Sequence, residues 1–204
     1  LSGFPFDGES VMTSDDAVQL KWIPRHLLII GAGVIGCEFA FIYRSLGSAV
    51  TLVELQTRAL STEDEDISGI IERELKKTKI SLITSVSVAS ISKQAGGVTT
   101  AVLSNGQEIQ ADAVLVSIGR SLNTEHLRLE DAGIAMGKRG EVPVNDRMET
   151  AVPGIYAVGD VTGGMMLAHV ASRQGIVAVE NALGGDVRMD YASVPAGIFT
   201  RPEI

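Results

Sequence analysis

Residues 26–38 read HLLIIGAGVIGCE. A short apolar run leads directly into a Gly-x-Gly-x-x-Gly pattern made by Gly31, Gly33 and Gly36, and a helix-like pattern follows. In turns of this kind the first glycine allows a tight bend, the second lets the backbone approach a pyrophosphate, and the third lets the helix pack against the strand. The stretch therefore predicts a dinucleotide-binding turn between a buried strand and a helix.

The residues after the turn have the spacing of an amphipathic helix. Its apolar positions are Val34, Ile35, Phe39, Ile42, Tyr43 and Leu46, and Gly47 is a suitable stop. The N-terminus of such a helix favours phosphate groups, because its N–H groups are unpaired and its dipole is positive there.

A second strand is expected from Ala49, and it ends in a carboxylate at Glu54, 18 positions after Gly36. This spacing is typical of the acid that accepts the two ribose hydroxyls of an adenosine, which favours NAD. Arg58 lies near enough to leave NADP open on charge alone. A purely structural glycine turn is the alternative, but the strand, the helix and the spaced acid agree with a binding site.

The composition is that of an ordinary globular protein. The 204 residues, 45% of them apolar, suffice for one large domain or two small ones. The net charge of −8 argues against nucleic acid or an anionic membrane as a partner. The single cysteine, Cys37, excludes an internal disulfide and a Cys-x-x-Cys pair within these residues. We expect a packed thiol, with activation at the helix N-terminus as the alternative.

The rest of the first half predicts a Rossmann-like sheet. Residues 1–22 are polar and weakly periodic and are interpreted as a connector. Ser61 and Thr62, followed by the acidic run 63–66, predict a helix start, and we interpret the acids as a solvated first turn rather than a metal site. The apolar face of that helix is Ile67, Ile70, Ile71 and Leu75. A third parallel strand is expected at Ile80–Ile83.

The pattern then changes to alternation. Residues 84–111, with the strong hairpin signal Asn105-Gly106, predict a three-stranded antiparallel meander. The parallel sheet resumes at residues 113–119, which are apolar on both faces. The expected fold class is thus α/β, a Rossmann-like parallel sheet with an inserted meander, plus part of a second α/β domain.

That second part contains another candidate site. Residues 150–160 predict a turn and a buried strand that ends in Gly159-Asp160, at the sheet edge where ligands bind in open α/β folds. A helix is expected over Met166–Leu183, closed by Gly184. Asp160 is interpreted either as a ligand-binding carboxylate or as a capping residue.

Five segments together resemble the flavin-dependent pyridine nucleotide-disulfide oxidoreductases along the whole chain. They are GAGVIGCE at 31–38, VTLVE at 50–54, SIGRSLNT at 117–124, IYAVGD at 155–160 and MLAH at 166–169. The resemblance implies a connector from an FAD domain at 1–22, an NAD-binding domain at 23–145, a returning FAD-domain segment at 146–190 and the truncated start of a dimer-interface domain at 191–204. It also marks the chain as a fragment.

The resemblance implies roles for residues as well. Those expected to bind NAD are Gly31, Gly33, Val34, Ile35, Gly36, Glu38, Glu54, Val86 and Gly119, with Ile35 and Glu38 near the nicotinamide and Val86 at the adenine. Those expected at FAD are Asp160, on the ribitol, and Met166, Leu167, Ala168 and His169, beside the isoalloxazine. No metal site is expected.

The choice of branch within the family depends on absences. Val34 replaces a gating tyrosine, and Leu55 and Ser61 stand where NADPH-using members place arginines. These features favour NAD and the branch that oxidises dihydrolipoamide. Four positions depart from the common pattern, Val170, Arg173, Gln174 and Arg201, and leave room for a divergent paralogue such as a mercuric reductase-like enzyme. A non-catalytic NADH-sensing module also stays open, whereas a simple Rossmann dehydrogenase would need a catalytic Tyr-Lys or His-Asp pair after residue 120.

The resemblance places both redox cysteines upstream of this chain and the catalytic His-Glu pair downstream. None of His26, His126 and His169 suits a general base, so no catalytic residue is expected here. The fragment alone should bind NAD(H) weakly and FAD poorly, and should lack dithiol oxidation activity. For the full-length protein the resemblance implies a cytoplasmic homodimer, with a 2-oxo acid dehydrogenase complex as a possible partner.

Overall fold

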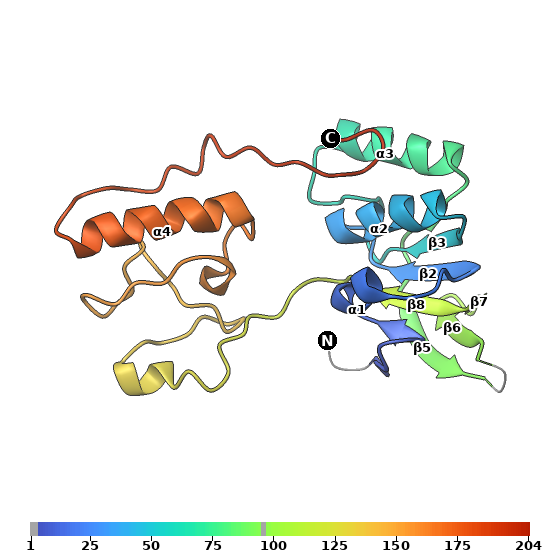
Figure 1. Ribbon diagram of the computed structural model, residues 1–204, viewed down its shortest axis with the longest axis horizontal. Coiled ribbons are helices and arrows are strands. Elements are labelled where there is room, and N and C mark those ends of the chain that lie inside the picture. Colours follow the sequence, from blue (N-terminus) through green and yellow to red (C-terminus); the bar gives the residue numbers. More distant parts are fainter. Residues whose placement is uncertain (1–3, 95–96) are drawn as a thin grey trace. The chain divides into compact units, whose positions relative to one another are not determined.

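The computed structural model describes residues 4–94 and 97–204, and it divides into two compact units (Figure 1). Unit 1 contains the described residues up to Gly119 together with Gly197–Ile204. Unit 2 is Arg120–Ala196. The chain therefore leaves unit 1 once and returns to it near its C-terminal end.

Unit 1 is built on a five-stranded sheet in which every neighbouring pair is parallel. Its order is β1-β8-β2-β3-β4. The strands are β1 (Val11–Met12), β2 (His26–Ile30), β3 (Ala49–Val53), β4 (Ser81–Ile83) and β8 (Ala113–Val116). The central strands are almost wholly buried, as expected for a parallel sheet covered on both faces.

One face of the sheet is covered by helices. These are α1 (Ser14–Gln19), α2 (Val34–Ser45) and α3 (Glu65–Lys77). Side chains alternate along β2, so Leu27 and Ile29 pack in one core with α2 and α3, whereas Leu28 and Ile30 face the opposite layer. Within α3, Ile71 and Leu75 are fully buried in the first core.

The opposite face carries the predicted antiparallel meander. It consists of β5 (Val88–Lys93), β6 (Thr99–Leu103) and β7 (Glu108–Ala111), with the order β5-β6-β7. The β6–β7 turn contains Gly106 at φ +85°, a conformation that glycine adopts without strain. The expected α/β fold with an inserted meander is confirmed.

Two details of unit 1 were not predicted from the sequence. The connector 1–22 contains β1 and α1; its Thr13 caps α1 in a reciprocal capping box with Asp16. Helix α3 begins at Glu65 with Asp64 as its cap, because the Asp64 carboxylate accepts the N–H of Asp66; Ser61 and Thr62 precede the helix.

Residues 155–160 do not form the buried strand that the sequence predicts. They are half-buried, and within this segment the structure has one isolated bridge, between Glu149 and Tyr156. A strand requires neighbours that pair with its N–H and C=O groups, and in unit 2 no strand lies beside this segment.

Unit 2 is organised around α4 (Ala168–Ala182), which begins two residues later than the sequence predicts and is followed by Gly184 at φ +91°. Two 3-10 turns, Leu129–Ala132 and Asp160–Thr162, precede it. Its core is formed by Met148, Val170, Val177, Ala178 and Met189.

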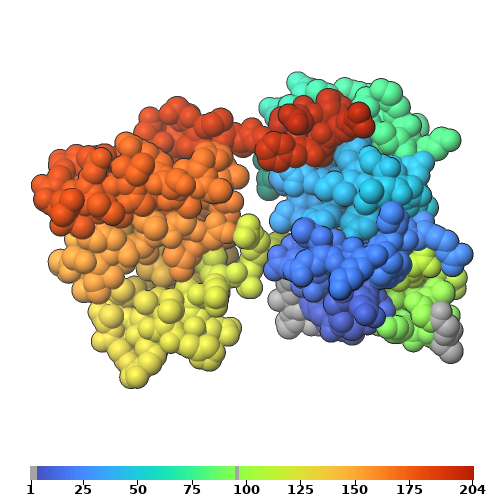
Figure 2. All heavy atoms as spheres, viewed as in Figure 1, coloured from blue at the N-terminus to red at the C-terminus, as the bar shows by residue number. Residues whose placement is uncertain are grey.

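The two compact units are defined by packing within the chain, and the expected division into four segments stays a prediction. Residues 120–145 belong to unit 2; they follow β8, which is the last strand of the unit 1 sheet in sequence order. Residues 197–204 pack on unit 1, where the side chain of Ile198 joins the core beneath α2 and α3. Figure 2 shows this C-terminal segment, coloured red, against the atoms of unit 1. Among the described residues, no helix has the length and apolar character needed to cross a membrane.

Candidate functional site

The glycine-rich turn between β2 and α2 explains its own composition. Gly31 has φ +99°, and a Cβ on it would lie 2.5 Å from the carbonyl oxygen of Ser117, which directly follows the neighbouring strand β8. A Cβ on Gly36 would overlap the carbonyl oxygen of Gly31. Around Gly33, by contrast, a Cβ would meet no atom within 4 Å. The first and third glycines are therefore fixed by packing inside unit 1, and the second faces open space.

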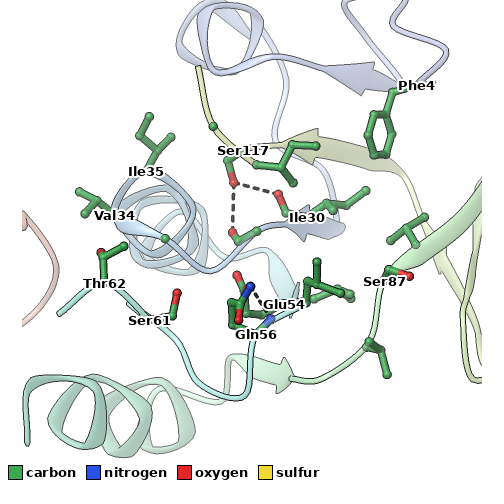
Figure 3. Close-up of a pocket in the computed structure, with 18 residues that line it drawn as sticks. Phe4, Ile30, Val34, Ile35, Glu54, Gln56, Ser61, Thr62, Ser87 and Ser117 are labelled. Atoms are coloured by element: carbon green, nitrogen blue, oxygen red, sulfur yellow. Dashed lines mark hydrogen bonds between the residues drawn. The ribbon is translucent and has the colours of Figure 1, made fainter. Parts of the chain in front are cut away.

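That space is a pocket of about 590 Å³, which is a typical size for a small-molecule site (Figure 3). It lies at the carboxyl ends of β2, β3 and β8, where open α/β sheets bind ligands. The residues that line it are Phe4, Ile30, Gly31, Gly33, Val34, Ile35, Val53, Glu54, Leu55, Gln56, Ser61, Thr62, Val86, Ser87, Val88, Ser117, Ile118 and Gly119.

Glu54, directly after β3, is bonded to the turn. One of its carboxylate oxygens accepts the N–H of Ala32 at 2.7 Å, and the other accepts the N–H of Gln56 at 2.8 Å. Glu54 is half-buried, and it is the only ionisable residue among those that line the pocket. The pocket thus combines one negative charge with mainly apolar walls.

The N-terminus of α2 opens onto the same pocket. Gly33 is the N-cap, and Val34 and Ile35 in the first turn line the pocket. No acidic residue lies in that first turn, so the helix's own side chains do not offset the positive end of its dipole. The arrangement can accept an anionic group beside the turn and hydroxyl donors at Glu54.

Arg58 does not face the pocket. Its guanidinium donates to the Glu65 carboxylate at 2.9 Å and to the carbonyl oxygen of Glu63 at 2.9 Å, so it ties the β3–α3 connection to the start of α3. Arg58 was the residue whose positive charge could have favoured NADP. It binds Glu65 and Glu63 instead, and it is absent from the pocket lining.

Cys37 lies one residue past the third glycine and is fully buried. Burial, together with the negative charges of Glu54, Glu38 and Glu72, raises the pKa of the Cys37 thiol to about 12. The thiol donates to the carbonyl oxygen of Ala32 at 3.4 Å. The structure agrees with a packed thiol and excludes the activated alternative, because thiolate is the reactive form.

Most residues expected at NAD line this one pocket: Gly31, Gly33, Val34, Ile35, Glu54, Val86 and Gly119. Gly36 lies behind them in the packed turn. Glu38 is not part of the lining; its carboxylate accepts the N–H of Phe199 at 3.0 Å. Sequence reasoning missed several lining residues, above all Phe4, because the connector that contains it shows no periodic pattern.

In unit 2, Asp160 lies in the 3-10 turn that follows Gly159, whose φ is +81°. Its carboxylate is 3.3 Å from the guanidinium of Arg120, and both residues line a pocket of about 230 Å³ together with Met166. Met166 and Leu167 precede α4, and Ala168 begins it. His169 is exposed, and its Nε2 lies 2.8 Å from the carbonyl oxygen of Pro195.

A buried amide supports the Gly159–Asp160 segment from α4. The Gln174 side chain is 1% exposed; its Oε1 accepts the N–H of Gly159 at 2.6 Å and its Nε2 donates to the Tyr191 hydroxyl at 2.9 Å. Gln174 thus fixes the backbone just before Asp160. From the sequence, Gln174 was noted only as one of the residues that differ from the family's common lysine and acids.

A comparison with protein-family models matches residues 2–175 to the pyridine nucleotide-disulphide oxidoreductases. The chain belongs to this family. Dihydrolipoyl dehydrogenase of Bacillus subtilis is 43% identical to this chain over 203 residues, which is 98% of the chain. The mitochondrial dihydrolipoyl dehydrogenase of Bos taurus is 39% identical to it over 208 residues, which is 99% of the chain. The match covers 43% and 41% of those two relatives, so the chain spans less than half of their length.

Solved structures of the same family superpose on the entire chain. LpdA from Mycobacterium tuberculosis gives a TM-score of 0.93 at 35% identity, with 44% of that protein covered. The HOCl-induced flavoprotein disulfide reductase RclA from Escherichia coli gives a TM-score of 0.89 at 31% identity, with 47% covered. The resemblance found in the sequence is thus confirmed at the level of the family.

Proposed function

We propose that unit 1 binds NAD(H), and that the whole protein is an FAD-dependent enzyme that oxidises dihydrolipoamide with NAD⁺. The observation that carries the proposal is Glu54, a lone carboxylate at the end of β3 in a pocket that also contains a helix N-terminus. A carboxylate accepts hydrogen bonds from both ribose hydroxyls and repels a 2′-phosphate. No cation among the lining residues offsets that repulsion.

The residues fit a dinucleotide in detail. The open space at Gly33 admits the diphosphate close to the backbone, and the first turn of α2 supplies N–H donors to it. Glu54 keeps acceptor capacity after its two backbone contacts, because an ionised carboxylate offers about four lone-pair sites. The adenosine ribose is thereby fixed while the rest of the cofactor extends along the pocket.

In unit 2, Asp160 fits a role as acceptor for a hydroxyl of the FAD ribitol. It adjoins a small pocket, and the Gln174 amide holds the preceding glycine in place. Met166, Leu167, Ala168 and His169 would lie along the flavin near the start of α4, whose positive end favours negative charge. When bound, FAD supplies electron transfer between a dithiol and NAD⁺. The residues of this chain contribute binding and placement, and none of them acts as acid or base.

Titration calorimetry with NADH and NADPH tests the cofactor assignment. We expect NADH to bind more tightly than NADPH, and Glu54→Gln to weaken NADH binding by about 1–3 kcal/mol, because a charged acceptor is lost. Glu108→Gln is the matched control, since Glu108 is exposed on β7 and is not part of the pocket. Equal or tighter binding of NADPH to the unaltered chain would refute the assignment.

The reaction and its setting belong to the same proposal. Both relatives described above bear the name dihydrolipoyl dehydrogenase, which supports dihydrolipoamide as substrate. We also propose that the full-length protein is a cytoplasmic homodimer that serves a 2-oxo acid dehydrogenase complex. An assay of the full-length protein with dihydrolipoamide and NAD⁺ tests the reaction, and sedimentation tests the dimer.

A second candidate is a reductase of another disulfide, as in a divergent paralogue. The similarity to RclA favours it, as do Arg173, Gln174 and Arg201, which depart from the common pattern. Absence of dihydrolipoamide turnover, together with NADH oxidation in the presence of another acceptor, would select this candidate.

A further inference from the structure

The pocket of unit 1 has two chemically different ends. Val34 and Ile35, next to the glycine turn, mark one end, and Phe4 and Ser87 mark the other, with Glu54 between them (Figure 3). Val86 and Val88, the chain neighbours of Ser87, also line the pocket, and they pack with Phe4 against the same apolar core. Phe4 comes from the segment before β1, whereas Val86 and Val88 come from the start of the meander at β5.

The chemistry of a dinucleotide decides which of its groups reaches this end. The diphosphate occupies the helix N-terminus at the turn, and the ribose hydroxyls occupy Glu54. In adenosine the phosphate is attached to C5′ of the ribose and the base to C1′, on the other side of the ring. The base therefore points away from the turn, toward the end of the pocket that contains Phe4.

We propose that Phe4 forms an aromatic wall of the adenine subsite. The inference rests on the proposed binding of NAD(H) and adds a residue that lies outside the Rossmann strands and helices. An adenine ring has a planar π-face, and contacts between such faces and aromatic side chains stabilise nucleotide binding in a base-tolerant way. The remaining walls, Val86 and Val88, are branched aliphatic side chains suited to the opposite edge of a flat base.

The segment around Phe4 is held firmly enough to present the ring. The Phe6 ring lies 6.1 Å from that of Phe4, tilted by 54°, and the Phe6 N–H donates to the carbonyl oxygen of Phe4 at 3.0 Å. Asp7 then accepts the N–H groups of Glu9, Ser10 and Val11 and the ammonium of Lys93 on β5. Phe4 and Phe6 both pack against the core beneath the meander.

Two alanine variants separate binding from packing. Phe4→Ala removes the pocket wall, whereas Phe6→Ala removes the adjacent ring, which packs on the same core but is not part of the lining. We expect Phe4→Ala to raise the Kd of NADH and of ADP about three- to tenfold, and Phe6→Ala to change each less than twofold. ADP serves as the second probe because it retains the base, the ribose and the diphosphate and lacks the nicotinamide.

Phe4→Leu provides a variant that keeps apolar bulk if alanine disturbs the fold. If its thermal midpoint is unchanged, Phe4→Leu should still weaken the binding of NADH and of ADP, because leucine has no π-face. NADH affinity unchanged in both Phe4 variants, or lowered equally in Phe6→Ala, would overturn the role of Phe4 and leave the proposed function intact. Failure of the unaltered chain to bind NADH or ADP would overturn both.

Discussion

Gly33 and Gly36 are glycines for different physical reasons, although they belong to one motif. A side chain at Gly36 would overlap the carbonyl oxygen of Gly31, which lies inside the packed turn. At Gly33 the backbone has φ −74°, which any residue adopts, and the space around it is open. One position is therefore constrained by folding and the other by the proposed ligand.

The two alanine variants should separate these constraints. Gly36→Ala should lower the free energy of unfolding by about 1–3 kcal/mol, as overpacking does. Gly33→Ala should leave stability within about 0.5 kcal/mol and weaken NADH binding instead, because its Cβ would enter the space assigned to the diphosphate. Urea unfolding and calorimetry on both variants provide the measurements. Undiminished NADH affinity in Gly33→Ala would contradict the assignment of that space.

The thiol of Cys37 should be inert in the folded protein. Since burial and the neighbouring carboxylates raise its pKa to about 12, almost none of it is thiolate at pH 8, and no solvent reaches it. A maleimide reagent should label Cys37 slowly in the native state and rapidly in urea. Rapid, complete labelling without denaturant would show that the turn opens readily.

Individual site residues were predicted correctly from the sequence where the periodic pattern of a strand or helix fixes their position. Glu54 was found because the apolar pattern of β3 stops one residue earlier. The role of Arg58 was not predictable, because its partners include carbonyl oxygens of Ser61 and Glu63 whose positions depend on the folded connection. Phe4 was missed for the same reason, since only the folded connector brings it to the pocket.

At the scale of elements, periodic segments were predicted well and short ones poorly. Strands β2 and β3 and helix α2 carry strong patterns, and their observed bounds agree with the expectation. Strand β1 has two residues and no period, and its position at the sheet edge comes from pairing with β8. The apolar run at 155–158 has the composition of a strand, yet composition does not supply a pairing neighbour.

The hydrogen bonds that the Asp7 carboxylate accepts in the loop before β1 depend on pH. Burial by itself raises the pKa of the Asp7 carboxyl, but three backbone N–H donors and the Lys93 ammonium outweigh it and hold that pKa well below its ordinary value. A lowered pKa means that the stabilisation is complete above the ordinary value of about 3.9, and it is lost as pH falls through the lower value of the folded state.

We expect Asp7→Asn to lower the free energy of unfolding by about 1 kcal/mol at pH 7, a figure kept small because the side chain is 38% exposed. The difference from the unaltered chain should shrink at pH 3 and below. Urea unfolding followed by Trp22 fluorescence measures it, and Asp15→Asn is the control, since no hydrogen bond to the Asp15 side chain is formed among the described residues. A difference that grows on acidification would contradict the sign.

At the scale of the whole molecule, the discontinuity of unit 1 was not foreseen. The residues at 197–204 carry no periodic signal that would place them against the sheet of unit 1. The most deeply buried apolar contact of this segment with unit 1 is Ile198, which is 5% exposed and belongs to the core with α2 and α3. Ile204 packs against the same core, and the Phe199 N–H donates to Glu38, so tertiary contacts rather than local structure decide where the segment lies.

Ile198→Ala should therefore destabilise unit 1 by about 2 kcal/mol, the lower end of the cost of an aliphatic truncation in a core. Phe199→Ala, at a side chain 72% exposed, should cost less than about 0.5 kcal/mol. The only tryptophan, Trp22, reports on unit 1, so its fluorescence during urea unfolding follows the relevant transition. Equal stability of the two variants would contradict the burial of Ile198 in the core of unit 1.

The pair of backbone contacts made by Glu54 has a consequence for the rate of association. Since the Ala32 N–H donates to Glu54, and the Gly31 N–H to the carbonyl oxygen of Val53, the end of β3 is already joined to the turn, and a nucleotide meets little reorganisation on arrival. Stopped-flow traces should then be single-exponential with a rate linear in concentration, and related dinucleotides should differ chiefly in how long they stay.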